Sequence, residues 1–238
     1  MILRVVGSSS AGNGYLLEAS DGSQLILEAG CPPRAFRKSG GMRTADVKAV
    51  LISHSHGDHA KYAKDFVRAG IGVYSTMEMN EHCAGVQPLT AGETYGYGEF
   101  RVTPFEVEHD VPCFGYLVFH RECGPLLFAT DCYNQHQVFK GIRHFLIEAN
   151  YSDELLARAM SDGTTPKAAA DRIRLSHLSL EHCEEYVGMC DAKASAHTIT
   201  LIHLSSRHAR PDEFAMRIQK KTGVPTSAAR QGTTINLV

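Results

Sequence analysis

The chain has 238 residues, a formal net charge of −2 at pH 7 and 43% hydrophobic residues, so it can bury a sizeable core in one domain. The near-neutral charge excludes a global basic field for nucleic acid, although a local patch can still serve. The seven cysteines form no C-x-x-C pair, no signal peptide is recognisable, and no apolar run approaches the roughly 18 residues of a membrane span. We therefore expect a single cytoplasmic domain over residues 1–238 that does not enter membranes.

The first third of the chain is predicted to form short strands. Apolar runs at 2–7, 15–19 and 24–28 are separated by turns that contain Gly, Ser and Asp. The run from Val47 to Ile52 predicts a strand buried on both faces. A helix is expected from Ala60 to Ala69, because its apolar residues recur at helical spacing beside a polar face.

The rest of the chain alternates strands with helices. Strands are expected at 73–75, 100–107, 115–119, 126–129, 144–147 and 195–202, and helices at 153–160, 180–190 and 211–222. Strands dominate the first half and strand–helix alternation dominates the second, which predicts two packed sheets with helices outside them.

Three histidines and an aspartate follow the strand that ends at Ile52. His54 and His56 are two positions apart, so on an extended chain they point the same way and can grip one ion. After a glycine, Asp58 and His59 project differently and can hold a second ion. A solvated loop is the alternative interpretation, but the carboxyl end of a buried strand is where α/β proteins bind ligands, which favours a metal site.

Three further residues of ligand type also stand just past predicted strands, namely His109, Asp131 and His203. One polar residue in such a position usually caps the strand or faces solvent. Three of them, in a chain that already carries the histidine cluster, favour a shared metal site.

The H-x-H-x-D-H motif, followed in order by a lone His, an Asp and a final His, resembles the metallo-β-lactamase superfamily over essentially the whole chain. The resemblance implies an α+β fold, an αββα four-layer sandwich with a two-metal site between the edges of its sheets. It implies one ion held by His54, His56 and His109, a second held by Asp58, His59 and His203, and a bridging Asp131. The ions would be divalent, with zinc suited to these ligands and manganese or iron acceptable.

The segment Leu25–Gly30 stands where this superfamily usually carries an Asp, but it offers Glu28. By the resemblance, this residue supports the metal ligands from behind.

Flanking motifs resemble the YycJ/WalJ-type nucleases and the core of ribonuclease Z. The opening Gly7–Asn13 is similar to their Ser-rich, Gly-Asn opening. Glu148, after a later strand, and His177, before a helix start, resemble the pair that relays a proton to the leaving oxygen in this group. The alternative for His177 is a plain residue near Ser179, a predicted helix N-cap.

These motifs predict a two-metal phosphodiesterase that cleaves DNA or RNA with a metal-bound hydroxide, and whose catalytic residues are Asp58, Glu148 and His177. Only 22 positions separate His109 from Asp131, too few for the arm with which ribonuclease Z grips tRNA. One alternative is hydrolysis of a small cyclic nucleotide or another small ester. Another is a non-catalytic metal-binding protein, against which the complete ligand set argues.

Basic residues near the predicted site are candidates for phosphate contacts. Arg34, Arg37 and Lys38 fall in a Gly-containing segment, expected to be a loop, soon after Glu28. Arg207 and His208 follow the last ligand closely and are also candidates. A charge run in a loop is usually only solvated, so we weigh that alternative beside the substrate interpretation.

Overall fold

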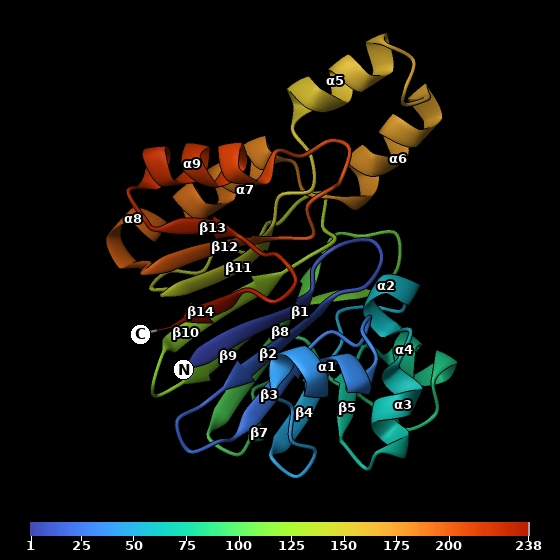
Figure 1. The fold of residues 1–238 in the computed structure, drawn as a ribbon, viewed down its shortest axis with the longest axis vertical. Coiled ribbons are helices and arrows are strands. Elements are labelled where there is room, and N and C mark those ends of the chain that lie inside the picture. Colours follow the sequence, from blue (N-terminus) through green and yellow to red (C-terminus); the bar gives the residue numbers. More distant parts are fainter. Residues whose placement is uncertain (238) are drawn as a thin grey trace.

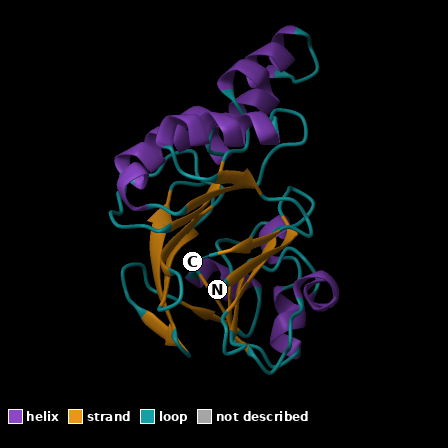
Figure 2. Ribbon diagram, turned by 60° about the vertical axis from the view of Figure 1, so that its left-hand side comes forward, coloured by secondary structure: helices purple, strands orange, loops and turns teal. Residues whose placement is uncertain are grey.

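The computed structural model describes residues 1–237, which form two seven-stranded sheets packed face to face with helices on both outer sides (Figures 1 and 2). The strand order is β14-β1-β2-β3-β4-β5-β6 in the first sheet and β13-β12-β11-β10-β9-β8-β7 in the second. Each sheet has an antiparallel part and a parallel part. This αββα arrangement confirms the predicted fold class.

The strands of the first sheet come mostly from the start of the chain. They are β1 (Ile2–Gly7), β2 (Gly14–Glu18), β3 (Gln24–Leu27), β4 (Val47–Leu51), β5 (Val73–Ser75), β6 (Val86–Pro88) and β14 (Thr234–Asn236). The second sheet contains β7 (Tyr95–Tyr97), β8 (Phe100–Val107), β9 (Cys113–His120), β10 (Gly124–Ala129), β11 (His144–Glu148), β12 (Thr198–Ile202) and β13 (Thr226–Ala228).

The central strands are apolar throughout because both of their faces are covered. In β2, Tyr15 and Leu17 belong to the core between the sheets, whereas Leu16 packs in the cluster under the outer helices. In β10, Phe128 faces the other sheet, and Leu127 packs under the helices of its own side. This alternation follows the two-residue period of a strand.

The helices form two outer layers and a projecting hairpin. The first sheet is covered by α1 (Pro33–Gly40), α3 (Ala63–Arg68) and α4 (Met77–His82), and the second by α7 (Leu180–Met189), α8 (Ala192–Ser195) and α9 (Pro211–Thr222). The short α2 (Gly57–Ala60) begins inside the histidine motif. The hairpin of α5 (Asp153–Ser161) and α6 (Lys167–Ser176) extends away from both sheets (Figure 1). No helix within residues 1–237 has the length and apolar character needed to cross a membrane.

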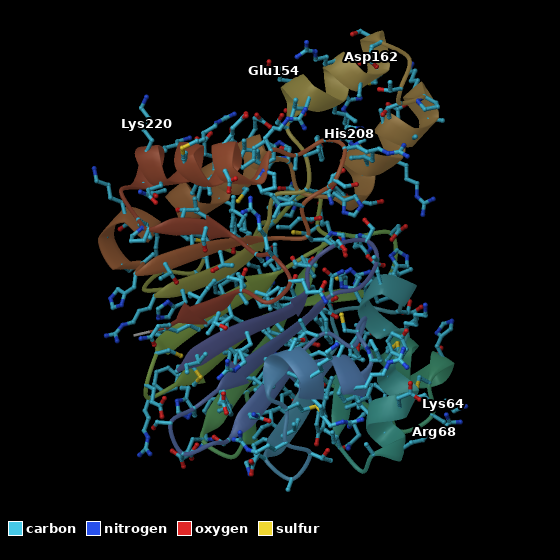
Figure 3. All side chains as sticks on the ribbon, viewed as in Figure 1. Lys64, Arg68, Glu154, Asp162, His208 and Lys220 are labelled. Atoms are coloured by element: carbon cyan, nitrogen blue, oxygen red, sulfur yellow. The ribbon has the colours of Figure 1, made fainter. Side chains whose placement is uncertain are left out.

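The α5–α6 hairpin has a small core of its own, in which Tyr151, Leu156 and Ala170 are buried. Its tip is tied to the body of the protein by His208, whose Nε2 lies 2.9 Å from Thr165 Oγ1. Figure 3 shows His208 at this junction. The hairpin is therefore an appendage with a defined attachment point.

Two predictions about helices were wrong. The single helix expected over 60–69 is divided into α2 and α3, because the backbone N–H of Tyr62 donates to Ala29 O (2.9 Å) and Tyr62 leaves helical geometry. The segment after Glu28, expected to be a loop, forms α1, which Pro33 begins and a left-handed Gly41 ends.

Candidate metal centre

The candidate site residues stand at strand ends that the fold brings together. Glu28, Asp131 and His203, which follow β3, β10 and β12, adopt left-handed backbone with φ of 69°, 47° and 52°. Among the other described non-glycine residues, only Asp191 has a positive φ in this region. Such conformations cost about 1–3 kcal/mol each and persist where the surrounding structure enforces them. The strain is thus concentrated at the candidate site.

The first cluster consists of His54, His56 and His109, whose ligand atoms lie within 4.8 Å of one another. His109 Nε2 is 3.3 Å from His56 Nδ1. His54 Nδ1 contacts Ser53 Oγ (2.8 Å), while its Nε2 is buried without a hydrogen-bond partner among the described residues. Burial lowers the pKa of His54 and of His109, which leaves neutral imidazoles with lone pairs free for a metal ion.

The second cluster consists of Asp58, His59, Asp131 and His203, also within 4.8 Å of one another. Asp58 Oδ2 lies 3.4 Å from His59 Nε2 and 3.2 Å from His203 Nε2. Asp131 Oδ2 contacts His59 Nε2 and lies 3.9 Å from His54 Nε2. Asp131 therefore stands between the two clusters, where a bridging ligand has to be.

The electrostatics of the second cluster fit a bound cation. Burial opposes the charge of Asp131, yet His203 and His59 hold its pKa well below the usual range. Burial likewise opposes protonation of His59 and His203, yet Asp131 raises the pKa of both. The buried carboxylates thus require positive charge beside them, and imidazoles with carboxylates are donors that zinc, manganese and iron accept. The residues present fit two divalent ions.

Glu28 is buried directly behind the second cluster. Both of its carboxylate oxygens accept from the backbone N–H of Ser53 (3.3 Å each), and Oε1 lies 3.4 Å from His59 Nδ1. A carboxylate on the far nitrogen of a ligating histidine fixes the ring and raises its basicity. Glu28 is placed to act on His59 in this way.

The opening loop, Gly7–Asn13, contacts the candidate ligands directly. This segment served in the sequence analysis only as a point of resemblance, and its contacts were not predicted. Ser8 Oγ accepts from the backbone N–H of His203 (3.0 Å). The backbone N–H of Asn13 donates to Asp58 O (2.8 Å), and Asn13 Nδ2 lies 3.1 Å from His59 Nε2. The Ser-rich, Gly-Asn sequence therefore holds three of the candidate ligands in place.

Gly30 allows a close approach of two backbone segments at this point. A Cβ atom on Gly30 would lie 1.8 Å from Asp58 O and 2.6 Å from Asn13 N. Any side chain there would push the loop that carries Asp58 away from its place. The requirement for glycine comes from this approach, not from the φ angle.

Glu148 contacts two histidines at once. Its Oε1 lies 2.8 Å from His177 Nδ1 and 2.9 Å from His203 Nδ1, and its Oε2 accepts from the backbone N–H of Leu178 (3.1 Å). His177 Nδ1 also lies 2.8 Å from Asp131 Oδ1. Burial lowers the pKa of His177, but Glu148 and Asp131 outweigh this effect and raise it to about 9. Glu148 thus orients both His177 and a candidate metal ligand.

A pocket of about 220 Å³ opens onto the clusters and joins parts of the chain far apart in sequence. Candidate ligands line it together with Ser10 of the opening loop and Arg172, Ser176 and His177 from the end of α6. Arg172 is the one Lys or Arg side chain among the described lining residues. The sequence offered no sign of it, because α6 was not predicted and only the fold carries this helix to the metal clusters.

The family model described as the metallo-beta-lactamase superfamily matches residues 9–80, which include the histidine motif and β2 to β5. This match covers 72 of the 238 residues and shows that this part of the chain is similar to the superfamily.

Curated proteins that are similar to this chain include nucleases. Exodeoxyribonuclease YycJ of Bacillus anthracis is 28% identical over 169 residues, 64% of each chain. Ribonuclease Z of Thermobifida fusca is 27% identical over 147 residues, 49% of this chain and 46% of that protein. The matched region thus spans slightly less than two thirds of YycJ and about half of ribonuclease Z.

Solved structures show the same fold at lower identity. YhfI of Bacillus subtilis, described as a metallo-beta-lactamase fold protein, has a TM-score of 0.76 and 15% identity over 99% of each chain. Human tRNase Z, short form, has a TM-score of 0.69 and 15% identity over 100% of each chain.

The predicted substrate residues lie outside the pocket that opens onto the ligand clusters. Arg34, Arg37 and Lys38, which we call the α1 basic residues, are exposed on α1, and none of them lines the pocket. Arg207 is exposed and does not line it either. His208 is 5% exposed, and its ring nitrogens face Thr165 Oγ1 (2.9 Å) and Ser205 Oγ (3.4 Å). His208 therefore holds the α5–α6 hairpin, which corrects its assignment to substrate.

Proposed function

We propose that the protein is a metal-dependent phosphodiesterase that cleaves nucleic acid. The observation that carries the proposal is the Glu148–His177 pair, which lies in the same pocket as two ligand clusters joined by Asp131. A hydrolytic metal site needs no such pair, whereas a proton donor at this place accelerates cleavage of a phosphodiester with a poor leaving group. The similarity to an exodeoxyribonuclease and to a ribonuclease Z supports the same substrate class.

The ligand clusters would hold two divalent ions, zinc by the chemistry of their donors. When bound, these ions supply Lewis acidity that activates water and neutralises charge on the phosphate. His54, His56 and His109 form the first set of ligands. Asp58, His59 and His203 form the second, and Asp131 contacts both.

His177 is the proton donor in this proposal. Its Nδ1 faces Glu148 and Asp131, each at 2.8 Å, so the other ring nitrogen, Nε2, is left for the substrate. In the metal-free protein, Glu148 and Asp131 raise the pKa of His177 to about 9, so the ring carries a proton at neutral pH before the ions bind. That proton is transferred to the oxygen that leaves phosphorus, and Glu148 fixes the orientation of the His177 ring during the transfer.

Arg172 is the substrate-binding residue that the pocket offers. A guanidinium binds two phosphate oxygens in a fork and stays charged at any physiological pH. Arg172 stands five positions before His177 on α6 and lines the same pocket. We propose that Arg172 binds the phosphate next to the one that is cleaved.

The test is hydrolysis by the full chain loaded with Zn²⁺ or Mn²⁺. The substrates are single-stranded DNA, duplex DNA, RNA, 3′,5′-cyclic AMP and bis(p-nitrophenyl) phosphate, and Asp58→Asn serves as the matched inactive variant. We expect cleavage of nucleic acid that chelation and Asp58→Asn abolish. Cleavage of cyclic AMP alone would replace the proposal with a small-substrate function, and no hydrolysis by the metal-loaded chain would leave a non-catalytic metal-binding protein.

A further inference from the structure

The metal pocket contains one carboxylate that belongs to neither ligand cluster. The acidic residues among its described lining are Asp58, Asp110 and Asp131, and two of them, Asp58 and Asp131, are members of the second cluster. Asp110 directly follows His109 in the loop that joins β8 to β9. Its carboxylate therefore has no role in the ligand sets assigned so far.

Asp110 lies against the first cluster. Its Oδ1 is 3.0 Å from His109 Nε2 and 3.5 Å from His56 Nε2. His109 Nε2 is also the atom that lies 3.3 Å from His56 Nδ1. The carboxylate thus stands on the side of the His109 ring on which the atoms of the first cluster meet. No Lys or Arg among the described residues forms an ion pair with it.

The first cluster brings little negative charge to a divalent ion. Its three members are histidines, which bind metal ions as neutral imidazoles. Asp131, which lies 3.9 Å from His54 Nε2, is shared with the second cluster. Zinc accepts carboxylate oxygens beside imidazole nitrogens, so a further carboxylate at this place would neutralise part of the charge on the ion. Asp110 is the residue that the pocket offers for this purpose.

Asp110 differs from the buried ligands because it is free to turn away. Its side chain is 45% exposed, whereas that of Asp131 is 3% exposed. Arg172, on α6, lines the same pocket and is the residue to which we assign a phosphate. A phosphate that enters the pocket brings negative charge toward the Asp110 carboxylate, and like charges at such distances repel. The carboxylate and the phosphate therefore compete for the same place beside the first cluster.

Resting on the metal site of the proposed function, we propose that Asp110 is a displaceable ligand of the first ion. Its carboxylate binds the ion while no phosphate is present and so retains the ion in the protein. When a phosphate enters beside Arg172, a phosphate oxygen takes the place of the carboxylate, which turns toward solvent. Asp110 thus strengthens metal binding and weakens phosphate binding.

The first experiment measures Zn²⁺ affinity by competition with a chelating dye. It uses the Asp58→Ala variant, in which the first cluster keeps its three histidines, and repeats the comparison with Asp58 intact. We expect Asp110→Asn to weaken Zn²⁺ binding about tenfold or more in both backgrounds, the scale on which loss of a supporting carboxylate acts. Unchanged affinity in both backgrounds would overturn the inference.

Glu81→Gln is the matched control for this experiment. Glu81 is exposed on α4, lines the hollow that Asp110 shares on the other side of the metal pocket, and belongs to neither ligand cluster. The substitution removes the same charge, so we expect native Zn²⁺ affinity. An equal loss in Glu81→Gln would show that the charge of the region, not the contact of Asp110 with the histidines, decides the affinity.

The second experiment measures binding of inorganic phosphate to the full chain by calorimetry, at Zn²⁺ concentrations that saturate each variant. We expect Asp110→Asn to bind phosphate about fivefold more tightly than the native chain, opposite in sign to its effect on Zn²⁺. A residue that only holds the loop or the imidazoles in place would not produce opposite signs. Asp110→Glu, which restores a carboxylate, should return both affinities toward the native values. Unchanged or weaker phosphate binding by Asp110→Asn would overturn the inference.

Neither experiment depends on hydrolysis, so the two proposals fail separately. Both effects of Asp110→Asn in a chain that cleaves no phosphodiester would support the displaceable ligand and contradict the proposed function. Cleavage of nucleic acid by a chain in which Asp110→Asn changes neither affinity would support the function and contradict the displaceable ligand. A native chain that binds no Zn²⁺ would contradict both.

Discussion

Replacement of His177 by Gln in the metal-loaded protein removes the proposed proton donor while leaving an amide that can still bond Glu148. His177 lies outside the two proposed ligand clusters, and in the third group of close ligand-type atoms, with Asp131, Glu148 and His203, its Nδ1 faces the two carboxylates. We therefore expect the metal content to stay at the native level. Turnover of nucleic acid should fall about a hundredfold, the usual scale for the loss of a general acid, or about 2.7 kcal/mol.

The raised pKa of His177 shows how much of the expected loss of turnover comes from its protonation state. In the metal-free protein, where its pKa is about 9, His177 is about 99% protonated at pH 7, whereas an unperturbed histidine with a pKa of about 6.5 would be about a quarter protonated. The pairing with Glu148 and Asp131 thus increases the protonated fraction only about fourfold. Most of the hundredfold loss must come from the position of the donor in the pocket.

The raised pKa of His177 also predicts how the stability of the metal-free protein changes with pH. A histidine whose folded pKa lies above its unfolded value stabilises the fold below about pH 6.5, and this contribution disappears as the pH rises through 9. The shift corresponds to about 3 kcal/mol. His177→Gln should therefore lower the free energy of unfolding by about that amount at pH 6 and by little at pH 9.5, as urea denaturation at the two pH values would measure.

The decisive assay compares leaving groups. A dinucleotide has a poor leaving group, whereas p-nitrophenolate departs without a proton, so the loss in His177→Gln should nearly vanish on bis(p-nitrophenyl) phosphate. His182→Gln, at an exposed position on α7, is the matched control and should behave as the native chain. Equal losses on both substrates, or loss of a metal ion, would refute the reasoning.

Four further results follow from the site geometry. Asp58→Ala should reduce the bound metal from about two ions to about one, by elemental analysis, because the first cluster keeps all three histidines. Glu148→Gln should lower metal affinity as well as turnover, in a metal titration, since Oε1 also contacts His203 (2.9 Å). Gly30→Ala should lower the thermal midpoint through its clash with the Asp58 carbonyl, whereas Gly57→Ala, with nothing within 4 Å, should not. Neutralising the α1 basic residues together should leave the salt dependence of DNA cleavage unchanged, because they do not line the pocket.

The strands and the ligand motif could be predicted because their patterns are local. The apolar run before the histidines predicts β4, and ligand-type residues after β8, β10 and β12 fall where strands end. The division of the helix after His59 could not be predicted. It depends on the hydrogen bond from the backbone N–H of Tyr62 to the carbonyl of Ala29, which stands at a strand end distant in sequence. The left-handed backbone of Asp131 likewise depends on its surroundings and leaves no mark in the sequence.

The substrate side of the site was the hardest part to predict. A charge run such as the α1 basic residues looks the same in sequence whether or not it faces the metal clusters, and here it is exposed away from them. Arg172 stands alone in a segment without a clear periodic pattern, and only the fold of α6 brings it to the metal clusters. The role of His208 depends on Thr165, which is 43 positions away in sequence.

Among the described residues, β14 forms one edge of the first sheet. β14 pairs with β1, and the backbone N–H of Leu237 donates to Met1 O (2.9 Å), so the final residues close the edge on which the first residues lie. His203, in turn, is held by Ser8 of the loop that follows β1. During synthesis, the ligand set stays incomplete until residue 203 has emerged, because the clusters take their members from positions 54 to 203. The candidate metal centre therefore cannot assemble until about 200 residues of this sequence have been synthesised.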